Sequence, residues 1–183
     1  MTVKRDEGIR EGATAESLGK LRPAFVSDGT ITAGNASQIS DGGAAVIVAD
    51  RSAAEAAGLQ VLAEIVSYGQ TAGPDASLHE RPAEALRIAL KRAELSPSDL
   101  ALVEINEAFA AVALWSARLL ELPQERVNVS GGAVALGHPL GATGARIVVT
   151  LVNALRARGG GVGGAALCGG GGQGDALVLR VEG

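Results

Sequence analysis

The sequence predicts an α/β fold in which helices cover a mixed, mostly parallel β-sheet. From residue 59 onward, apolar runs of strand length alternate regularly with longer runs that have a helical apolar period. Near the end of the chain, only the glycines of 169–174 separate two apolar runs, which is typical of an antiparallel hairpin. Of the 183 residues 47% are hydrophobic but only 2% are aromatic, so the core has to consist of aliphatic side chains.

The first units of this alternation carry clear boundary signals. Val61–Tyr68 is an apolar run that a Gly/Pro loop ends, and we expect it to be a strand. Pro82–Leu95 is expected to be a helix, which Pro97 closes. Leu100–Ile105 is the next strand. The apolar residues of the helix recur on one face, at Ala85, Leu86, Ala89, Leu90 and Ala93.

The later units complete the order β-α-β-α-β-α-β-β. Glu107–Leu120 is expected to be a nearly all-apolar helix, and Val127–Val129 a short strand. Gly141–Arg158 should be a long helix, since basic residues in its last turn complement the helix dipole. Alternating units of this kind imply parallel pairing through right-handed crossovers. The final hairpin, Gly164–Cys168 and Ala176–Val181, adds an antiparallel pair.

Residues 1–58 follow no such pattern, so the chain is divided into 1–58 and 59–183. Residues 1–28 are rich in charge and lack an apolar period, which predicts a poor core. Ala44–Ala49 has the composition of a buried strand. Arg51–Ala57 is expected to be a short helix ending at Gly58, because glycine is favoured just after a helix.

Composition and charge exclude several classes of function. The net charge is −4 without a basic block, so we expect no nucleic-acid partner. No apolar run approaches the length of a membrane span, and the charged start of the chain lacks the apolar stretch of a signal peptide. A single cysteine excludes an internal disulfide and a cysteine-rich metal site. We therefore expect a cytoplasmic protein without a metal and without contact to a membrane.

Three polar loops follow the expected strands, at 106–109, 130–144 and 168–174, and should meet at one edge of the sheet. Asn106 opens an apolar helix, so it is by default an N-cap, but together with Glu107 it could instead hold a water or a substrate carbonyl. His138 lies between Gly137 and Pro139. It is either a surface or capping histidine or, as a neutral imidazole beside a helix N-terminus, a base or hydrogen-bond donor.

Cys168 ends an expected strand and precedes four glycines. Most free cysteines are small buried hydrophobes, but these glycines would leave the sulfur reachable and supply backbone N–H groups for an oxyanion. The glycine spacing also matches a dinucleotide-binding motif, which we reject because a strand follows instead of a helix. His79 is expected to be a solvated loop residue and Trp115 a core residue. The pattern alone indicates a Cys/His/Asn site for acyl or carbonyl chemistry.

Four segments together resemble the thiolase family. The resemblance extends from about Leu18 to the end of the chain and implies the C-terminal half of the five-layered thiolase fold. Residues 1–58 would be the tail of the family's loop region and a remnant of its N-terminal domain, and residues 59–183 the C-terminal domain. The segments are Thr32-Ala33-Gly34-Asn35-Ala36-Ser37, Asn106-Glu107-Ala108-Phe109-Ala110, the run 128–139 that ends in Gly137-His138-Pro139, and Cys168-Gly169-Gly170-Gly171-Gly172.

The resemblance implies a role for each catalytic position. His138 would deprotonate a nucleophilic cysteine and, with a water that Asn106 holds, donate to the thioester oxygen as an enolate develops. Cys168 would be the acid and base that takes or returns the α-proton of the second acyl-CoA. The N–H of Gly170 would help to hold the oxyanion of the acyl-enzyme step. This is a Claisen condensation of acetyl-CoA, or the reverse thiolysis, in fatty acid metabolism.

The resemblance also implies binding positions and partners. Acyl-CoA and coenzyme A would be substrate and product, so no further cofactor is expected. Ala36 and Ser37 would line the pantetheine channel, and Ala108 and Phe109 the acyl pocket. The loop Leu78–Pro82, which holds the substrate-binding candidate Leu78, departs from the Met-Gly-x-Gly-Pro form of many thiolases. That departure leaves chain-length preference open, although small pocket residues favour a short-chain enzyme.

The nucleophile is where the match ends. In the thiolase family the acyl-accepting cysteine lies in the N-terminal half, whereas the one cysteine of this chain matches the other role. We therefore expect this chain to be inactive alone, to expose apolar faces, to need an N-terminal half as partner and to form a homo-oligomer when complete. A non-catalytic CoA-binding or assembly subunit is the alternative. A condensing enzyme for carrier-protein thioesters is disfavoured, because by family resemblance such relatives have histidine or asparagine in place of Cys168.

Overall fold

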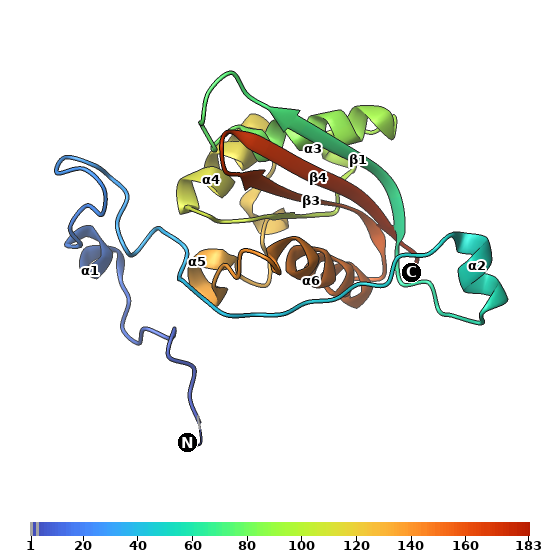
Figure 1. Cartoon of the computed structure of the whole chain (residues 1–183), viewed down its shortest axis with the longest axis horizontal. Coiled ribbons are helices and arrows are strands. Elements are labelled where there is room, and N and C mark those ends of the chain that lie inside the picture. The colour runs from blue at the N-terminus through green and yellow to red at the C-terminus, as the bar shows by residue number, and fades with distance from the viewer. Residues whose placement is uncertain (1, 3) are drawn as a thin grey trace.

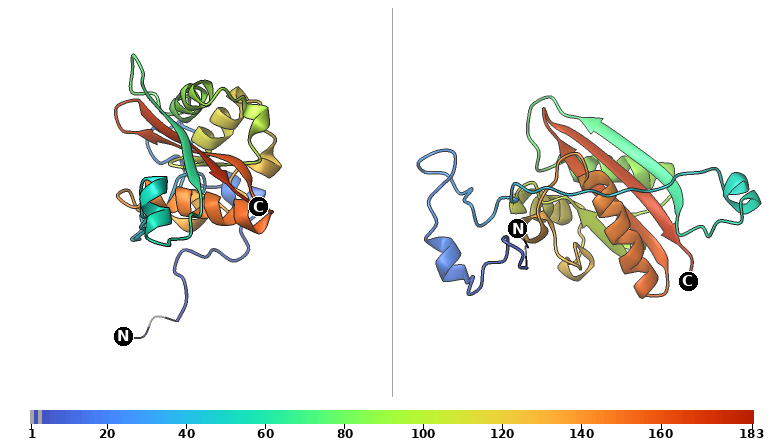
Figure 2. Two further views of the ribbon diagram at one scale, coloured as in Figure 1. Left: turned by 90° about the vertical axis from the view of Figure 1, so that its right-hand side faces the viewer. Right: turned by 60° about the horizontal axis from the view of Figure 1, so that its bottom comes forward.

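The computed structural model describes residue 2 and residues 4–183, and it shows one four-stranded sheet between two layers of helices (Figure 1). The strands are β1 (Glu64–Ala72), β2 (Leu102–Ile105), β3 (Gly161–Gly169) and β4 (Gln173–Val181). They lie side by side in the order β1-β4-β3-β2. Helices α3 (Arg81–Arg92) and α4 (Ala110–Leu119) cover one face, and α5 (Ala133–Leu136) and α6 (Thr143–Ala157) cover the other (Figures 1 and 2).

The α/β class, the mixed sheet and the terminal hairpin are confirmed, but the expected excess of parallel pairs is wrong. Only β2 and β3 are parallel; β1 with β4 and β3 with β4 are antiparallel. The expected strand Val127–Val129 is reduced to a single bridge between Val103 and Val127. The reason is local, because Asn128 has a φ of 49° and turns the chain away from the sheet directly after that bridge.

The expected helices are present with shifted ends. The expected helix 82–95 is α3, and 141–158 is α6, which ends at Ala157. The expected helix 107–120 begins only at Ala110, since residues 107–109 are drawn into contacts described below. The sequence did not lead us to expect helix α5 or two short 3₁₀ turns, Pro97–Asp99 and Gln124–Arg126. Helix α2 (Arg51–Ala56) is close to its expected place, and α1 (Ala15–Gly19) adds one short turn.

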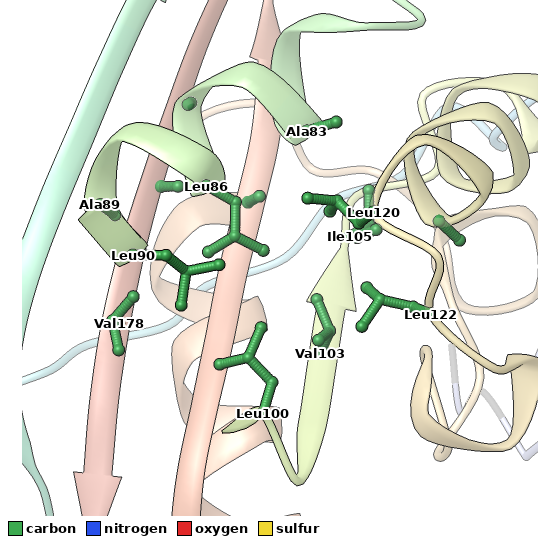
Figure 3. Packing of buried hydrophobic residues seen from close by; sticks show 14 of the residues in the cluster. Ala83, Leu86, Ala89, Leu90, Leu100, Val103, Ile105, Leu120, Leu122 and Val178 are labelled. Carbon is green, nitrogen blue, oxygen red and sulfur yellow. The ribbon is translucent and has the colours of Figure 1, made fainter. Parts of the chain in front are cut away.

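Two aliphatic clusters hold the layers together. Leu86 and Leu90 of α3 point toward the strands in Figure 3 and pack with Val178 of β4. On the opposite face, Ile147 and Leu151 of α6 belong to the second cluster. Burial of such side chains contributes about 1.5–3 kcal/mol each relative to exposure. Tight packing also explains Gly69 of β1, where a Cβ would collide with the backbone of α3.

The segment from residue 31 to 50 runs along α5 and α6 to reach α2, as Figure 1 shows in light blue. The expectation of a buried strand at 44–49 is wrong: Ile47 is 92% exposed, and Val46 and Val48 are also exposed. No strand of the described residues lies beside this segment to pair with it. The expectation of exposed apolar surface is confirmed here, with Ile39 fully exposed as well.

Trp115 also departs from expectation. It lies on α4 but is 39% exposed, and the guanidinium of Arg118 stacks 5.5 Å from the centre of its ring. The core side of α4 consists instead of Val112, Ala113, Ser116 and Ala117. His79 is exposed, as the sequence predicts. Among the described residues, none of the helices has the length and apolar character that crossing a membrane requires.

Candidate active site

The ends of β2 and β3 meet at one edge of the sheet, where two of the predicted polar loops begin. The backbone N–H of Asn106, just past β2, donates to the carbonyl oxygen of Ala166 in β3 at 2.9 Å. Along β2 side chains alternate between the faces, and Leu102 belongs to the cluster that packs on α6. The side chains of Glu104 and Asn106 therefore point to the α6 face.

Asn106 meets His138 on that face. The Nδ2 atom of Asn106 lies 3.3 Å from Nε2 of His138, although the two residues are far apart in the sequence. Asn106 is only 1% exposed, and its Oδ1 atom is buried without a hydrogen-bond partner among the described residues. The default interpretation of Asn106 as an N-cap is wrong, since the residue before α4 is Phe109. We expect a buried, unpaired amide oxygen to accept a hydrogen bond from a water or a ligand.

Hydrogen bonds fix the tautomer of His138. The hydroxyl of Thr143 donates its only proton to the carbonyl oxygen of Pro139 at 3.0 Å, so it accepts from Nδ1 of His138 at 2.7 Å. The proton of the neutral ring therefore sits on Nδ1, and the lone pair of Nε2 faces Asn106. Burial, and secondarily the charge of Arg146, lower the pKa of His138. The imidazole is thus held uncharged, in the form that can accept a proton.

Glu107 anchors the loop that carries His138. One carboxylate oxygen accepts from Nδ2 of Asn128 at 2.9 Å, and the other accepts from the N–H of Val134 at 3.0 Å. Gly132 allows this approach, because a Cβ there would collide with the carboxylate. Asn128 also exchanges two bonds of 2.8 Å with the backbone of Ile105. Glu107 therefore has a scaffolding contact in the structure, which ties the loop to the end of β2.

The predicted binding residues Ala36, Ser37, Ala108 and Phe109 lie together. The N–H of Ser37 donates to the carbonyl oxygen of Ala108 at 3.1 Å, and Ala36 forms a bridge with Phe109. This pairing keeps residues 107–109 extended and delays the start of α4. The ring of Phe25 meets that of Phe109 edge-on, with centroids 6.0 Å apart.

The same segment then reaches His138 itself. The N–H of His138 donates to the carbonyl oxygen of Gln38 at 3.3 Å. The side-chain amide of Gln38 in turn donates to the carbonyl oxygens of Val134 and Ala135, each at 3.3 Å. The polar loop at residues 32–37 is thereby joined to the loop of His138 by a short, bonded stretch of chain.

Cys168 lies one residue before the end of β3, and Gly170 lies in the turn that follows. Cys168 is half-buried, and burial raises the pKa of its thiol. The turn depends on glycine, since Gly171 and Gly172 have φ values of 84° and 81°. Within the part of the chain that the structure describes, no hydrogen bond joins Cys168 to Asn106 or His138. They lie at the same end of the sheet, after neighbouring strands β2 and β3.

Leu78 is half-buried in the loop between β1 and α3. The N–H of Gly73 at one end of this loop donates to the carbonyl oxygen of Gly172 at 2.8 Å. At the other end, the hydroxyl of Ser116 in α4 donates to the carbonyl oxygen of His79 at 2.8 Å. Leu78 thus lies between the glycine turn and α4.

Among the described residues no group of three or more His, Cys, Asp or Glu side chains has the arrangement that could hold a metal ion.

Two family models match the chain. The one described as thiolase, C-terminal domain, matches residues 59–181, and the one described as thiolase, N-terminal domain, matches residues 1–52. The chain belongs to the thiolase family.

Individual thiolases are similar over nearly the whole chain. A probable acetyl-CoA acetyltransferase of Mycobacterium tuberculosis is 58% identical over 175 residues, which are 96% of this chain and 44% of the relative. The crystal structure of the Bacillus anthracis acetyl-CoA acetyltransferase has a TM-score of 0.92 at 46% identity, over 97% of this chain and 45% of that one. The crystal structure of human mitochondrial 3-ketoacyl-CoA thiolase in complex with CoA has a TM-score of 0.88 at 40% identity, over 99% of this chain and 46% of that one. This thiolase chain spans less than half the length of these relatives.

Sequence reasoning missed several residues that shape this thiolase site. Thr143 fixes the tautomer of His138. The only sequence feature that could have predicted this role is a hydroxyl side chain at the start of the helix that follows the histidine. Glu104, which is 2% exposed, lies 3.4 Å from Arg146 of α6. A carboxylate inside an apolar strand and a cation in the first turn of a helix are both unfavourable alone, and that pair of anomalies was the available signal.

Proposed function

We propose that this chain is the C-terminal part of an acyl-CoA C-acyltransferase that condenses two acetyl-CoA molecules to acetoacetyl-CoA or runs the reverse thiolysis. One observation carries the proposal: a partly buried chain of side chains in which Thr143 fixes the proton on Nδ1 of His138 and Asn106 faces the free Nε2. Such an arrangement combines a base with a polar group whose oxygen has no partner. Enolate chemistry on a thioester needs a base and a polar group that can hold a hydrogen-bond donor against the thioester oxygen.

His138 serves as the base of the acyl-transfer step in this proposal. Its Nε2 takes the proton of a cysteine thiol, the resulting thiolate attacks the thioester carbonyl, and coenzyme A leaves as a thiol with the proton that Cys168 supplies. The bond from Asn106 to Nε2 is long, at 3.3 Å, so a substrate or thiol can replace it. Once Nε2 carries the proton, the ring becomes a donor to a thioester oxygen. The Thr143 contact keeps the ring oriented in both states.

Asn106 supports the enolate through a water. Its unpaired Oδ1 can accept one proton of a water molecule, whose second proton then points to the thioester oxygen. The charge that develops on that oxygen would be shared between this water and the protonated Nε2 of His138. Donors fixed in a site that excludes bulk water stabilise such charge most effectively.

Cys168 moves the α-proton. Burial raises the pKa of its thiol, so the sulfur carries its proton at neutral pH. In thiolysis it donates that proton to the α-carbon of the departing acetyl-CoA enolate. In condensation Cys168 first protonates the departing coenzyme A, and the thiolate that remains takes the α-proton of the second acetyl-CoA. A substrate that lies across the sheet edge would connect Cys168 to the Asn106–His138 pair. The N–H of Gly170 is proposed to contact the acyl-enzyme oxyanion.

Coenzyme A binding is proposed for the paired segments 35–37 and 108–110. Ala36 and Ser37 would lie along the pantetheine arm, and Ala108, Phe109 and Leu78 along the acyl group. The small side chains of Ala36, Ser37 and Ala108 suit a narrow, extended ligand. The complex of human mitochondrial 3-ketoacyl-CoA thiolase with CoA is consistent with a ligand of this class.

The nucleophilic cysteine must come from elsewhere, because the single cysteine of this chain has the other role. We propose that an N-terminal thiolase half supplies it and covers the exposed residues 46–48. We also propose that the boundary between the two parts of the chain lies at residue 58, that the protein is cytoplasmic and that the complete enzyme is a homo-oligomer. The apolar character of exposed residues 46–48 supports the covering partner.

Cleavage of acetoacetyl-CoA by coenzyme A tests the proposal. The chain alone should be inactive, and addition of the N-terminal half of the M. tuberculosis relative should restore turnover. Variant H138N should abolish that turnover, whereas H79N, the matched control at an exposed loop histidine, should not. Turnover by the chain alone, or full turnover of the complex with H138N, would overturn the assignment.

A non-catalytic CoA-binding or assembly subunit remains the second candidate, favoured by the absence of a second cysteine in the chain. Variant C168A in the reconstituted complex separates the two. Loss of turnover with retained CoA binding supports the enzyme. Unchanged turnover of the complex would assign this chain to binding or assembly.

A further inference from the structure

A charged pair lies directly beside the Asn106–His138 contact. Glu104 and Asn106 project from the same face of β2, two residues apart. Oε2 of Glu104 lies 3.4 Å from Nη1 of Arg146, and the two side chains are 2% and 19% exposed. Arg146 in turn follows Thr143 by three residues in α6, which places them on the same face of the helix. The ion pair therefore adjoins the residues that hold His138.

This pair is poorly suited to a purely structural role. Its ions have been removed from water, and the Nε and Nη2 atoms of Arg146 are buried without partners among the described residues. Burial raises the pKa of Glu104 to about 7, against the attraction of Arg146. Apolar residues of the same volume often serve a fold as well as or better than such a pair. Arg146 also stands in the first turn of α6, where a cation opposes the helix dipole.

We propose that the Glu104–Arg146 pair is a positioning element of the active site, in which the guanidinium keeps the His138 imidazole uncharged and the carboxylate partly offsets that effect. This inference rests on the base role proposed for His138. A nearby positive charge disfavours a second proton on the ring, and the pKa of His138 is lowered by burial and then by Arg146. Nε2 therefore stays free to accept the proton of a thiol at neutral pH.

The other ionisable groups around His138 do not account for the lowering of its pKa. Glu107, after β2, is hydrogen-bonded to Asn128 and Val134; its charge acts on Glu104, whereas the pKa of His138 is lowered by burial and Arg146. Cys168, on β3, has a raised pKa and is uncharged at neutral pH. Asp41, on the segment that passes over the loop of His138, is exposed and therefore screened by solvent. The buried Glu104 on β2 and the partly exposed Arg146 on α6 are the charged groups that face this region.

The test is a proton titration of His138 by NMR on the 183-residue chain. The chain has two histidines, so two imidazole resonances are expected, and exposed His79 serves as the internal reference. Variant R146M removes the guanidinium and should raise the pKa of His138. Variant E104Q removes the offsetting carboxylate and should lower it. In the double variant E104Q/R146M the pKa of His138 should be higher than in the wild type. In R156M, a change in the last turn of the same helix, the pKa of His138 should stay the same.

Opposite shifts of His138 from E104Q and R146M, with His79 unmoved, support the proposal. An unchanged or lowered pKa of His138 in both R146M and the double variant would overturn it. Should R146M fail to fold, the nearly isosteric E104Q still decides, since a rise or no change in that variant contradicts the proposal. In the reconstituted complex, the acidic limb of the pH–rate profile should shift with the titration. The NMR shift requires no turnover, so a wrong function and a wrong positioning role give different results.

Discussion

The hydroxyl of Thr143 lies 2.7 Å from Nδ1 of His138 and 3.0 Å from the carbonyl oxygen of Pro139. The hydroxyl donates its one proton to that carbonyl, and Nδ2 of Asn106, which can only donate, faces Nε2, so the neutral ring donates from Nδ1. This contact decides which nitrogen of His138 is basic, and the backbone turn before α6 places both groups. The chemistry of the loop thus depends on a side chain five residues after the histidine.

Thr143→Val tests this dependence. Because the Nδ1 proton loses its acceptor, both tautomers of His138 should become populated, and turnover of the reconstituted complex should fall. Removing a buried hydrogen bond should also lower the free energy of unfolding by about 1–3 kcal/mol. The tautomer is read from the ¹⁵N shifts of the two ring nitrogens. Thr143→Ser keeps the hydroxyl and should keep the Nδ1 tautomer; an unchanged tautomer in the valine variant would contradict the prediction.

Glu107→Gln should loosen the loop of residues 128–134. The carboxylate accepts from Nδ2 of Asn128 and from the N–H of Val134, and a glutamine amide can accept only one of these. The other bond becomes a contact between two donors, at a cost of about 1–3 kcal/mol. Urea unfolding measures the loss, and faster hydrogen exchange at the Val134 amide locates it. Protection at Val134 equal to that of the wild type would show that Glu107 does not anchor the loop.

Gly132→Ala examines the same anchor from the other side. A Cβ at Gly132 would collide with the Glu107 carboxylate, so the variant should be destabilised by about 1–3 kcal/mol, as expected for overpacking. Gly141→Ala is the matched control, because a Cβ there meets no atom within 4 Å. Thermal unfolding of both variants provides the comparison. Equal melting temperatures would contradict the close packing of Glu107 on Gly132.

Cys168 should react slowly with alkylating agents near neutral pH. Burial raises the pKa of its thiol, so the reactive thiolate is scarcer at pH 8 than in a free thiol, and its fraction grows only at higher pH. The chain has a single cysteine, so mass spectrometry after iodoacetamide treatment reports this site alone. Glutathione under the same conditions is the reference. A pH midpoint of alkylation at or below that of glutathione would rule out a thiol that keeps its proton at neutral pH.

Local sequence signals predicted the elements whose causes are local. The apolar face of α3 and the glycines between β3 and β4 are properties of short stretches, and both elements are confirmed. The start of α4 was misplaced because the pairing of Phe109 with Ala36 overrides helix propensity, and that contact spans more than seventy residues. The same limit hid Thr143 as the partner of His138. Chemistry-bearing residue types could be read from the chain, but which of them touch depends on the fold.

Ile47→Ser separates the fold of this chain from its proposed docking to an N-terminal half. Ile47 is 92% exposed, so the substitution should change the free energy of unfolding of the chain by less than about 0.5 kcal/mol. In the complex an apolar contact would be lost, so the affinity for the N-terminal half of the M. tuberculosis relative should fall. Leu151→Ala in the buried face of α6 is the contrasting control and should cost about 2–5 kcal/mol of stability. Calorimetric titration against that half measures the affinity; an unchanged affinity would mean that residues 46–48 face something other than the N-terminal half.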